Sequence, residues 1–170
     1  AAEASPNLGH FALVEMEQHL DDFTLITQNV DGYHRQAGSK NVLELHGNIQ
    51  RVKCFDSCGV VENWEKSSEV PRCPKCNAYL RPDVVWFGET LPLDVINTAY
   101  KATLECQAFF SIGTSALVQP AASLAHTARQ HGAIVVEINL DPTPLSSQVD
   151  FALHGKSGDI LPRLVQQVWG

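Results

Sequence analysis

The residues best suited to chemistry follow two short apolar runs near the N-terminal end of the chain. Two amides and a carboxylate follow the run over residues 23–27, and a histidine follows the run over residues 42–45; these residues are Gln28, Asn29, Asp31 and His46. Open α/β sheets bind ligands beyond the carboxyl ends of their strands, so the four side chains are expected at one edge of a sheet. One histidine alone would indicate little, but this combination predicts a catalytic site.

Four of the five cysteines form two closely spaced pairs. Cys54 and Cys58 are separated by three residues, Cys73 and Cys76 by two, and fourteen residues lie between the pairs. This spacing lets four thiolates converge on one tetrahedral zinc ion and leaves no open position for catalysis. Two disulfides or four ordinary thiols are the alternatives, and a reducing compartment disfavours disulfides. The pairs predict a structural zinc site, whereas Cys106, beside an apolar run, is expected to be a core thiol.

Two later apolar runs, residues 108–112 and 134–138, also end in polar segments. The residues that follow them are Gly113, Thr114, Ser115, Asn139, Leu140 and Asp141. A glycine with two hydroxyl groups ahead of a helix can bind a phosphate or a ribose, and a polar side chain at the next strand end can hold a ribose or an adenine edge. Each segment alone could be an ordinary turn. Three polar strand ends in one sheet together predict a nucleotide across its top.

Helices alternate with these strands, which is typical of a mostly parallel sheet. Ser5 is expected to cap a first helix with Pro6 in its first turn. Apolar residues at helical spacing predict its buried face: Leu8, Phe11, Ala12 and Met16. Further helices are expected over residues 31–37, 93–104, 120–130 and 160–169, the last capped by Asp159. Further strands are expected over residues 49–53 and 84–87, on either side of the cysteine segment.

Composition narrows the class of protein. The chain has 170 residues, 44% of them hydrophobic, and a net charge of −7 without a block of Lys or Arg, which argues against non-specific nucleic-acid binding. No apolar run approaches the length of about 18 residues that a membrane span needs. The first residues lack the basic and then apolar pattern of a secretory signal, so a cytoplasmic protein is expected.

These motifs together resemble the sirtuins, which are NAD-dependent protein lysine deacylases. The resemblance covers nearly the whole chain and rests on the four cysteines and on these segments: Gln28-Asn29-Val30-Asp31, Leu45-His46-Gly47, Arg81-Pro82, residues 84–89, Gly113-Thr114-Ser115 and Asn139. It implies an α/β fold in which a Rossmann-like parallel sheet has helices on both faces, over residues 1–50 and 82–170. It also implies an inserted zinc-ribbon subdomain over residues 51–81.

The resemblance further implies a role for each matching residue. His46 would be the catalytic base, Asn29 would order the reacting groups, and Asp31 would hold the nicotinamide carboxamide. The other cofactor-binding positions would be Gln28, Val30, Gly113, Thr114, Ser115, Asn139, Leu140, Asp141 and Ser157. The backbone of the substrate-binding segment would add an acyl-lysine peptide as a strand, and its residues would be Val85, Trp86, Phe87 and Gly88.

The implied reaction removes acyl groups from protein lysines and gives nicotinamide and O-acyl-ADP-ribose. NAD would be the cosubstrate and zinc a structural ion, with acyl-lysine proteins or peptides as partners and neither nucleic acid nor membrane among them. Residues 84–89 resemble the branch that removes succinyl and malonyl groups as well as acetyl. That branch recognises the acyl carboxylate with a Tyr and an Arg, whose positions would lie before Ala1. Deacetylation and desuccinylation therefore both stay open.

Two departures from the family pattern accompany the resemblance. The first cysteine pair is spaced by three residues where sirtuins usually have two, a difference that zinc knuckles tolerate. No glycine-rich strand-turn-helix for the NAD pyrophosphate occurs in the chain. We therefore expect the chain to be the C-terminal part of a larger protein, with weak NAD binding as it stands and an exposed edge on the strand beside the missing one.

Three other classes remain as alternatives. An NAD-dependent protein ADP-ribosyltransferase could share the nucleotide site and His46, but would leave ADP-ribose on its acceptor. An inactive fragment could serve as a zinc-ribbon binding module, against which the intact set of motifs argues. A nucleic-acid-binding zinc ribbon predicts a basic face, whereas acidic residues offset the basic ones in this segment.

Overall fold

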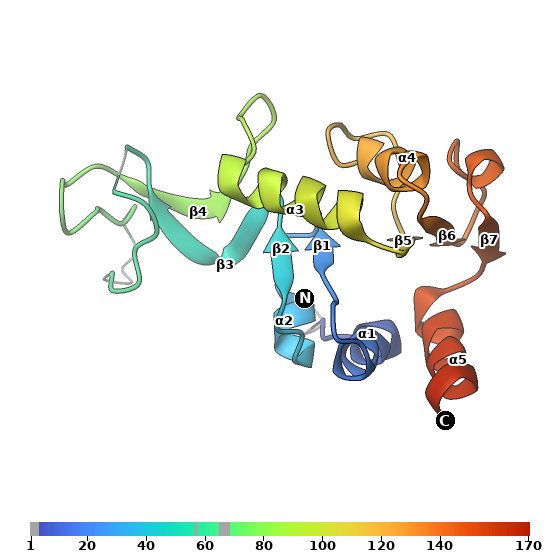
Figure 1. The fold of residues 1–170 in the computed structure, drawn as a ribbon. Coiled ribbons are helices and arrows are strands. Elements are labelled where there is room, and N and C mark those ends of the chain that lie inside the picture. Colours follow the sequence, from blue (N-terminus) through green and yellow to red (C-terminus); the bar gives the residue numbers. More distant parts are fainter. Residues whose placement is uncertain (1–3, 57, 65–68) are drawn as a thin grey trace.

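Two groups of parallel strands form the larger part of the molecule (Figure 1). The computed structural model describes residues 4–56, 58–64 and 69–170. In the first group β1 (Leu25–Thr27) pairs with β2 (Val42–Glu44), and Leu25 lies opposite Val42. The second group has the order β5-β6-β7, with the bounds Ala108–Ile112, Ile134–Asn139 and Phe151–His154. Every pairing within the two groups is parallel, as predicted.

Helices cover both faces of these strands. The helices are α1 (Leu8–His19), α2 (Tyr33–Ala37), α3 (Leu93–Glu105), α4 (Ser123–Gln130) and α5 (Ser157–Trp169), with a 3₁₀ turn at Ser146–Gln148. Figure 1 shows α3 and α4 on one side of the strands and α1, α2 and α5 on the other. Helices α1 and α5 pack together, and one core cluster joins Met16 and Leu161 of these helices to Leu25 and Ile138 of the two strand groups. This is the Rossmann-like arrangement that the sequence predicts.

A smaller unit extends to one side, beyond the first strand group (Figure 1). Strand β3 (Gly47–Cys54) pairs antiparallel with β4 (Leu80–Val84), and the cysteine segment lies between them. The unit has a core of its own, formed by Cys54, Val61, Cys73 and Leu80. The division of the chain at residues 51–81 stays a prediction.

The first helix starts two residues later than the sequence suggests. Asn7, not Ser5, is the N-cap: its side chain accepts from the Gly9 N–H at 2.8 Å, and its own N–H donates to His10 Nδ1 at 3.1 Å. Two residues of the predicted buried face, Leu8 and Phe11, are exposed, because the helix turns Gly9, Ala12, Leu13 and Met16 inward. A reciprocal cap fixes the start of a helix better than a Ser-Pro pair alone.

Three other predicted elements differ from the structure. Helix α5 begins at Ser157 after Lys156, so Asp159 lies in its first turn and is not the cap. The expected strand over residues 84–87 is wrong, since β4 ends at Val84. Helix α4 starts at Ser123, three residues after the expected Pro120. Strand β7 was not predicted, and all four of its residues are exposed, so its sequence carries no burial pattern.

Among the described residues, no helix combines the length and the apolar character needed to cross a membrane.

Candidate functional site

The polar residues at the carboxyl ends of β1, β5 and β6 meet at one edge of the strands. The side-chain amide of Gln28 donates to Thr114 Oγ1 at 3.4 Å. The side-chain amide of Asn139 donates to the backbone carbonyl of Thr114 at 2.7 Å. Thr114 therefore connects both strand groups at their carboxyl ends, where α/β sheets bind their ligands. The structure brings these three predicted site residues together.

His46 joins the same edge from the end of β2. Its Nδ1 lies 2.9 Å from the backbone carbonyl oxygen of Gln28. A carbonyl oxygen only accepts hydrogen bonds, so in the neutral ring Nδ1 carries the proton and Nε2 carries the lone pair. The side chain is half-buried. This arrangement gives the imidazole the form that a general base needs.

The segment after Gln28 is held by contacts with the start of β3. Asp31 Oδ1 accepts from the Tyr33 N–H at 2.9 Å and so closes the turn into α2. The carbonyl of Val30 accepts from the Ile49 N–H at 2.8 Å, and the carbonyl of Asp31 accepts from the Gln50 side-chain amide at 2.9 Å. Residues 30 and 31 are thereby fixed close to His46, while Asn29 is exposed beside them.

Gly47 allows the backbones of β3 and β4 to approach closely beside His46. Its φ is +79°, and a Cβ atom there would lie 2.1 Å from the carbonyl oxygen of Asp83. One step further along, the Val85 N–H donates to the carbonyl of His46 at 2.9 Å. The glycine thus lets the segment that begins at Val85 attach directly to the histidine.

The remaining predicted nucleotide positions surround the Asn139 strand end. Gly113, with φ +62°, donates its N–H to the carbonyl of Ile138 at 2.9 Å. The Gly155 N–H donates to the carbonyl of Asn139 at 2.8 Å, which places the turn before Ser157 beside that strand end. The other predicted residues are exposed at these ends; they are Ser115, Leu140 and Asp141.

Two buried carboxylates near the site were not singled out from the sequence. Glu44, two residues before His46, accepts from Asn48 Nδ2 at 2.8 Å and from Arg51 Nη1 at 2.6 Å. Glu137, two residues before Asn139, is 1% exposed and accepts from the hydroxyls of Thr143 and Ser146. A carboxylate at an inward-facing position of an apolar strand is the sequence signal that could have revealed Glu44 and Glu137. Such a residue is almost never buried without a partner, so its presence indicates a hydrogen-bonded site.

Two histidines lie behind Asp31, between α1 and α2. The rings of His10 and His34 have centroids 4.7 Å apart. Burial lowers the pKa of both histidines, and the neighbouring His10 lowers the pKa of His34 further. The negative charge of Asp31 raises both pKa values but does not outweigh the burial. The pair is therefore held in its neutral form near neutral pH.

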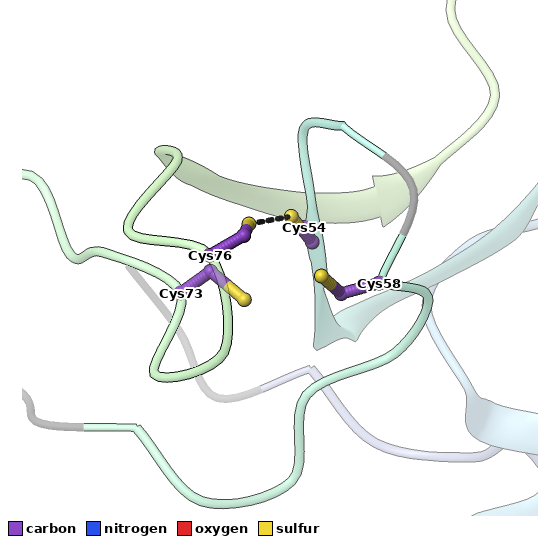
Figure 2. A group of neighbouring side chains, drawn as sticks. All are labelled: Cys54, Cys58, Cys73 and Cys76. Carbon is purple, nitrogen blue, oxygen red and sulfur yellow. Dashed lines mark hydrogen bonds between the residues drawn. The ribbon is translucent and has the colours of Figure 1, made fainter.

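The four predicted zinc ligands converge in the smaller unit (Figure 2). The sulfur atoms of Cys54, Cys58, Cys73 and Cys76 all lie within 4.8 Å of one another, and those of Cys54 and Cys76 are 3.4 Å apart. Ligands at about 2.3 Å around a tetrahedral zinc ion would stand about 3.8 Å apart. Burial raises the pKa of Cys73, but backbone hydrogen bonds from Cys76 and Lys75 outweigh it and lower the value to about 7. Four sulfurs with a ready thiolate fit structural zinc.

The predicted substrate segment leaves β4 as a turn. The Trp86 side chain is half-exposed, Phe87 is fully exposed, and Gly88 has φ +88°. The Glu89 N–H donates to the carbonyl of Trp86 at 2.9 Å and closes the turn. An extended strand is not formed here.

Comparison with known proteins agrees with this geometry. The chain is 48% identical over 174 residues to an NAD-dependent protein deacylase of Pyrococcus furiosus, covering 98% of this chain and 69% of the relative. It is 45% identical to NAD-dependent protein deacylase 1 of Archaeoglobus fulgidus, covering 97% of this chain and 68% of the relative. The chain thus spans about two thirds of the length of these relatives.

Solved structures give the same result. A Sir2 homologue in complex with NAD superposes with a TM-score of 0.90 at 45% identity, over 98% of this chain and 66% of that one. A Sir2–p53 peptide–NAD⁺ complex gives a TM-score of 0.87 at 34% identity, over 97% of this chain and 71% of that one. The model of the Sir2 family matches residues 1–120. The motifs, the fold and these relatives together make the chain a member of the Sir2 family, the sirtuins.

Proposed function

We propose that this chain removes acyl groups from protein lysines at the expense of NAD, giving nicotinamide and O-acyl-ADP-ribose. The observation that carries the proposal is the hydrogen bond between His46 Nδ1 and the Gln28 carbonyl, which leaves Nε2 as a base at the meeting point of the strand ends. The relatives support the chemistry: they are named NAD-dependent protein deacylases, and a mutant Sir2 homologue was solved with 2′-O-acetyl ADP ribose.

The residues around His46 have separate tasks in this proposal. Asp31 and Asn29 bind and orient the nicotinamide end, and Gln28 contacts the adjacent ribose. Bound NAD would supply the ribose carbon from which nicotinamide leaves and the ribose hydroxyl group to which the acyl group is transferred. His46 Nε2 accepts the proton of that hydroxyl, a transfer worth about 10²- to 10⁴-fold in rate.

The other end of the nucleotide is assigned to the strand ends of β5 and β6. Exposed backbone and hydroxyl groups there suit phosphate and ribose oxygens. The proposed contacts there are Gly113, Thr114, Ser115, Asn139, Leu140, Asp141 and Ser157. Val30, in the segment after β1, is a further proposed cofactor contact. The cysteine site holds a zinc ion that maintains the smaller unit and takes no part in the reaction.

The peptide substrate is assigned to the segment that leaves β4, residues 85–88. Val85 is already hydrogen-bonded to the His46 carbonyl, so a peptide along this segment would reach the histidine. Structures of Sir2 with a p53 peptide and with an acetylated peptide support a peptide substrate. A cytoplasmic location stays a prediction.

The purified chain incubated with NAD and paired acetyl- and succinyl-lysine peptides tests the proposal. Peptide mass and released nicotinamide are followed together. Equal loss of acyl group and gain of nicotinamide is the expected result, and the faster peptide identifies the acyl group. Peptide that gains ADP-ribose would establish a transferase in its place, and no turnover would contradict deacylation by this chain.

The variant His46→Ala tests the central role. It should lower turnover by at least about 10²-fold with the far-UV circular dichroism unchanged. The matched control is His126→Ala, because His126 is an exposed histidine on α4 whose ring nitrogen contacts only the Gln130 side chain among the described hydrogen bonds. Turnover retained in His46→Ala would remove His46 from the role of base.

A further inference from the structure

The guanidinium group of Arg81 lies at the junction between β4 and the turn that follows it. It stands 4.1 Å from the centroid of the Trp86 ring and 5.8 Å from that of Phe55. Its Nη2 donates to Glu89 Oε2 at 2.8 Å, and its side chain is only 11% exposed. The other amino nitrogen, Nη1, is buried without a hydrogen-bond partner among the described residues, so the aromatic ring is what offsets the burial of this part of the charge.

The turn over residues 86–89 is closed onto this arginine. Glu89 Oε2, which Arg81 binds, also accepts from the Trp86 N–H at 3.0 Å. The Glu89 N–H in turn donates to the Trp86 carbonyl at 2.9 Å. Both ends of the turn therefore contact the Arg81 guanidinium group, Trp86 through its ring and Glu89 through its carboxylate.

The same arginine lies one register position from a cysteine of the zinc site. It lies opposite Lys53 in the β3–β4 ladder, and the next pair along is Cys54 with Leu80. Phe55 follows Cys54 directly; its N–H donates to the Tyr79 carbonyl at 2.9 Å, and its ring centroid is 6.3 Å from that of Trp86. The zinc ligand Cys54 thus has two neighbours, Phe55 and Arg81, whose side chains lie near the Trp86 ring of the turn.

We propose that Arg81 is a positioning residue through which the metal-loaded cysteine site holds the 86–89 turn ready for the acyl-lysine peptide. The proposal rests on the proposed function, in that the turn is the peptide-binding segment. Its consequence is that loss of the metal loosens this turn and weakens peptide binding, while the nucleotide edge around Thr114 keeps its geometry.

Hydrogen–deuterium exchange of the Trp86 and Glu89 amides tests the coupling without any need for turnover. In the zinc-loaded chain, Arg81→Lys keeps the charge but loses the planar, forked contact, and should speed exchange of both amides on the order of tenfold. A zinc chelator should do the same to the unaltered chain and add little to Arg81→Lys, because both changes remove one shared interaction.

Arg72→Lys is the matched control. Arg72 also stacks in the smaller unit, with its guanidinium 4.3 Å from the Tyr79 ring centroid, but its described contacts are to Asn77 and Tyr79 and not to the turn. Amide exchange at residues 86 and 89 in Arg72→Lys should equal that of the unaltered chain.

Glu89→Gln, which keeps the shape of the side chain, provides a second variant on the Arg81–Glu89 contact and should behave as Arg81→Lys does. Zinc content and exchange in α1 and α5 are measured on every variant, so that a misfolded protein is recognised.

Unchanged exchange in both Arg81→Lys and Glu89→Gln, or a chelator effect that persists in full in Arg81→Lys, would overturn the coupling. Kinetics supply a second readout: the KM for peptide should rise on the order of tenfold in Arg81→Lys, with kcat and the KM for NAD unchanged. An equal rise in both KM values would contradict the positioning role. Absence of turnover in the unaltered chain would count against the proposed function alone, since the exchange experiment decides the coupling by itself.

Discussion

The imidazole of His46 is oriented by the backbone carbonyl of Gln28, 2.9 Å from its Nδ1, and not by a carboxylate side chain. The residue that follows β1 therefore fixes the tautomer of a histidine two positions beyond the end of β2. Because the partner is a main-chain atom, no side-chain substitution at Gln28 removes it directly. The same residue meets Thr114 through its own amide, so it touches both halves of the site.

We expect ¹⁵N spectra of the histidine-labelled chain to show His46 protonated at Nδ1 and unprotonated at Nε2 at pH 8. Gln28→Ala should leave this tautomer in place, since the carbonyl remains, while weakening the contact with Thr114. Spectra of His46→Ala identify the signal. A neutral ring protonated at Nε2 would contradict the hydrogen bond and the proposed base.

Gly47→Ala should be strongly destabilising. The added Cβ would meet the Asp83 carbonyl at 2.1 Å and would also require φ +79°, so the β3–β4 pair has to shift. We expect a loss of about 2–4 kcal/mol in the free energy of unfolding, measured by urea titration. Gly132→Ala is the control: its φ is +90° but nothing lies within 4 Å of the new Cβ, so only the backbone cost of about 1–2 kcal/mol applies. Equal losses in the two variants would show that the close approach is absent.

Stability should fall with acid through the His10–His34 pair. Burial lowers the pKa of both residues in the folded chain, so below the ordinary value of 6.5 the unfolded chain binds more protons than the folded one. The contribution of the two histidines to the free energy of unfolding is complete above about pH 6.5 and is lost as the pH falls toward their lowered pKa values in the folded chain. The slope is at most about 1.4 kcal/mol per pH unit for each histidine.

The double variant His10→Gln/His34→Gln should flatten the pH dependence of the free energy of unfolding below pH 6.5, relative to the unaltered chain. His126→Gln, at an exposed position on α4, is the matched control for the loss of a histidine. A double variant as acid-sensitive as the unaltered chain would mean that other groups produce the slope.

The cysteine site should bind one zinc ion per chain. Cys73→Ser should abolish binding, because only three of the four converging sulfurs would remain to hold the ion, whereas Cys106→Ser should retain the full content. Metal analysis after gel filtration measures both. Removal of zinc should loosen the core formed by Cys54, Val61, Cys73 and Leu80 and leave the helical circular dichroism signal nearly unchanged, since α1 and α5 pack in a separate core. Zinc retained by Cys73→Ser would show that the four sulfurs do not act together.

The strand ends were predictable because each follows a short apolar run and carries polar residues that a strand interior would not tolerate. The cysteine site was predictable from spacing alone. The start of α1 was not: Ser5 and Asn7 are both good caps, and the reciprocal bond with His10 decides between them only in three dimensions. Strand β7 was missed because exposed residues such as Phe151 give no inward and outward pattern.

Interactions across long stretches of chain were also beyond the sequence. Arg51 and Asp83 are 32 residues apart, and their hydrogen bond depends on the pairing of β3 with β4. The predicted strand over residues 84–87 failed for a similar reason, because Arg81 and Glu89 draw that segment into a turn. Local propensity describes residues such as Val85 and Trp86 as strand-forming, and the tertiary contacts decide otherwise.

The packing of α1 against α5 has a consequence for how the chain is made. Met16 and Leu161 share one core cluster although nearly the whole described sequence separates them. During synthesis the apolar side of α1 leaves the ribosome well before α5, and Leu25 and Val42 of the same cluster can cover only part of it until α5 has been made. Such contacts between distant segments slow folding and expose sticky surface. This core should therefore close only after α5 has been synthesised, so its formation depends on contacts between distant segments of the chain.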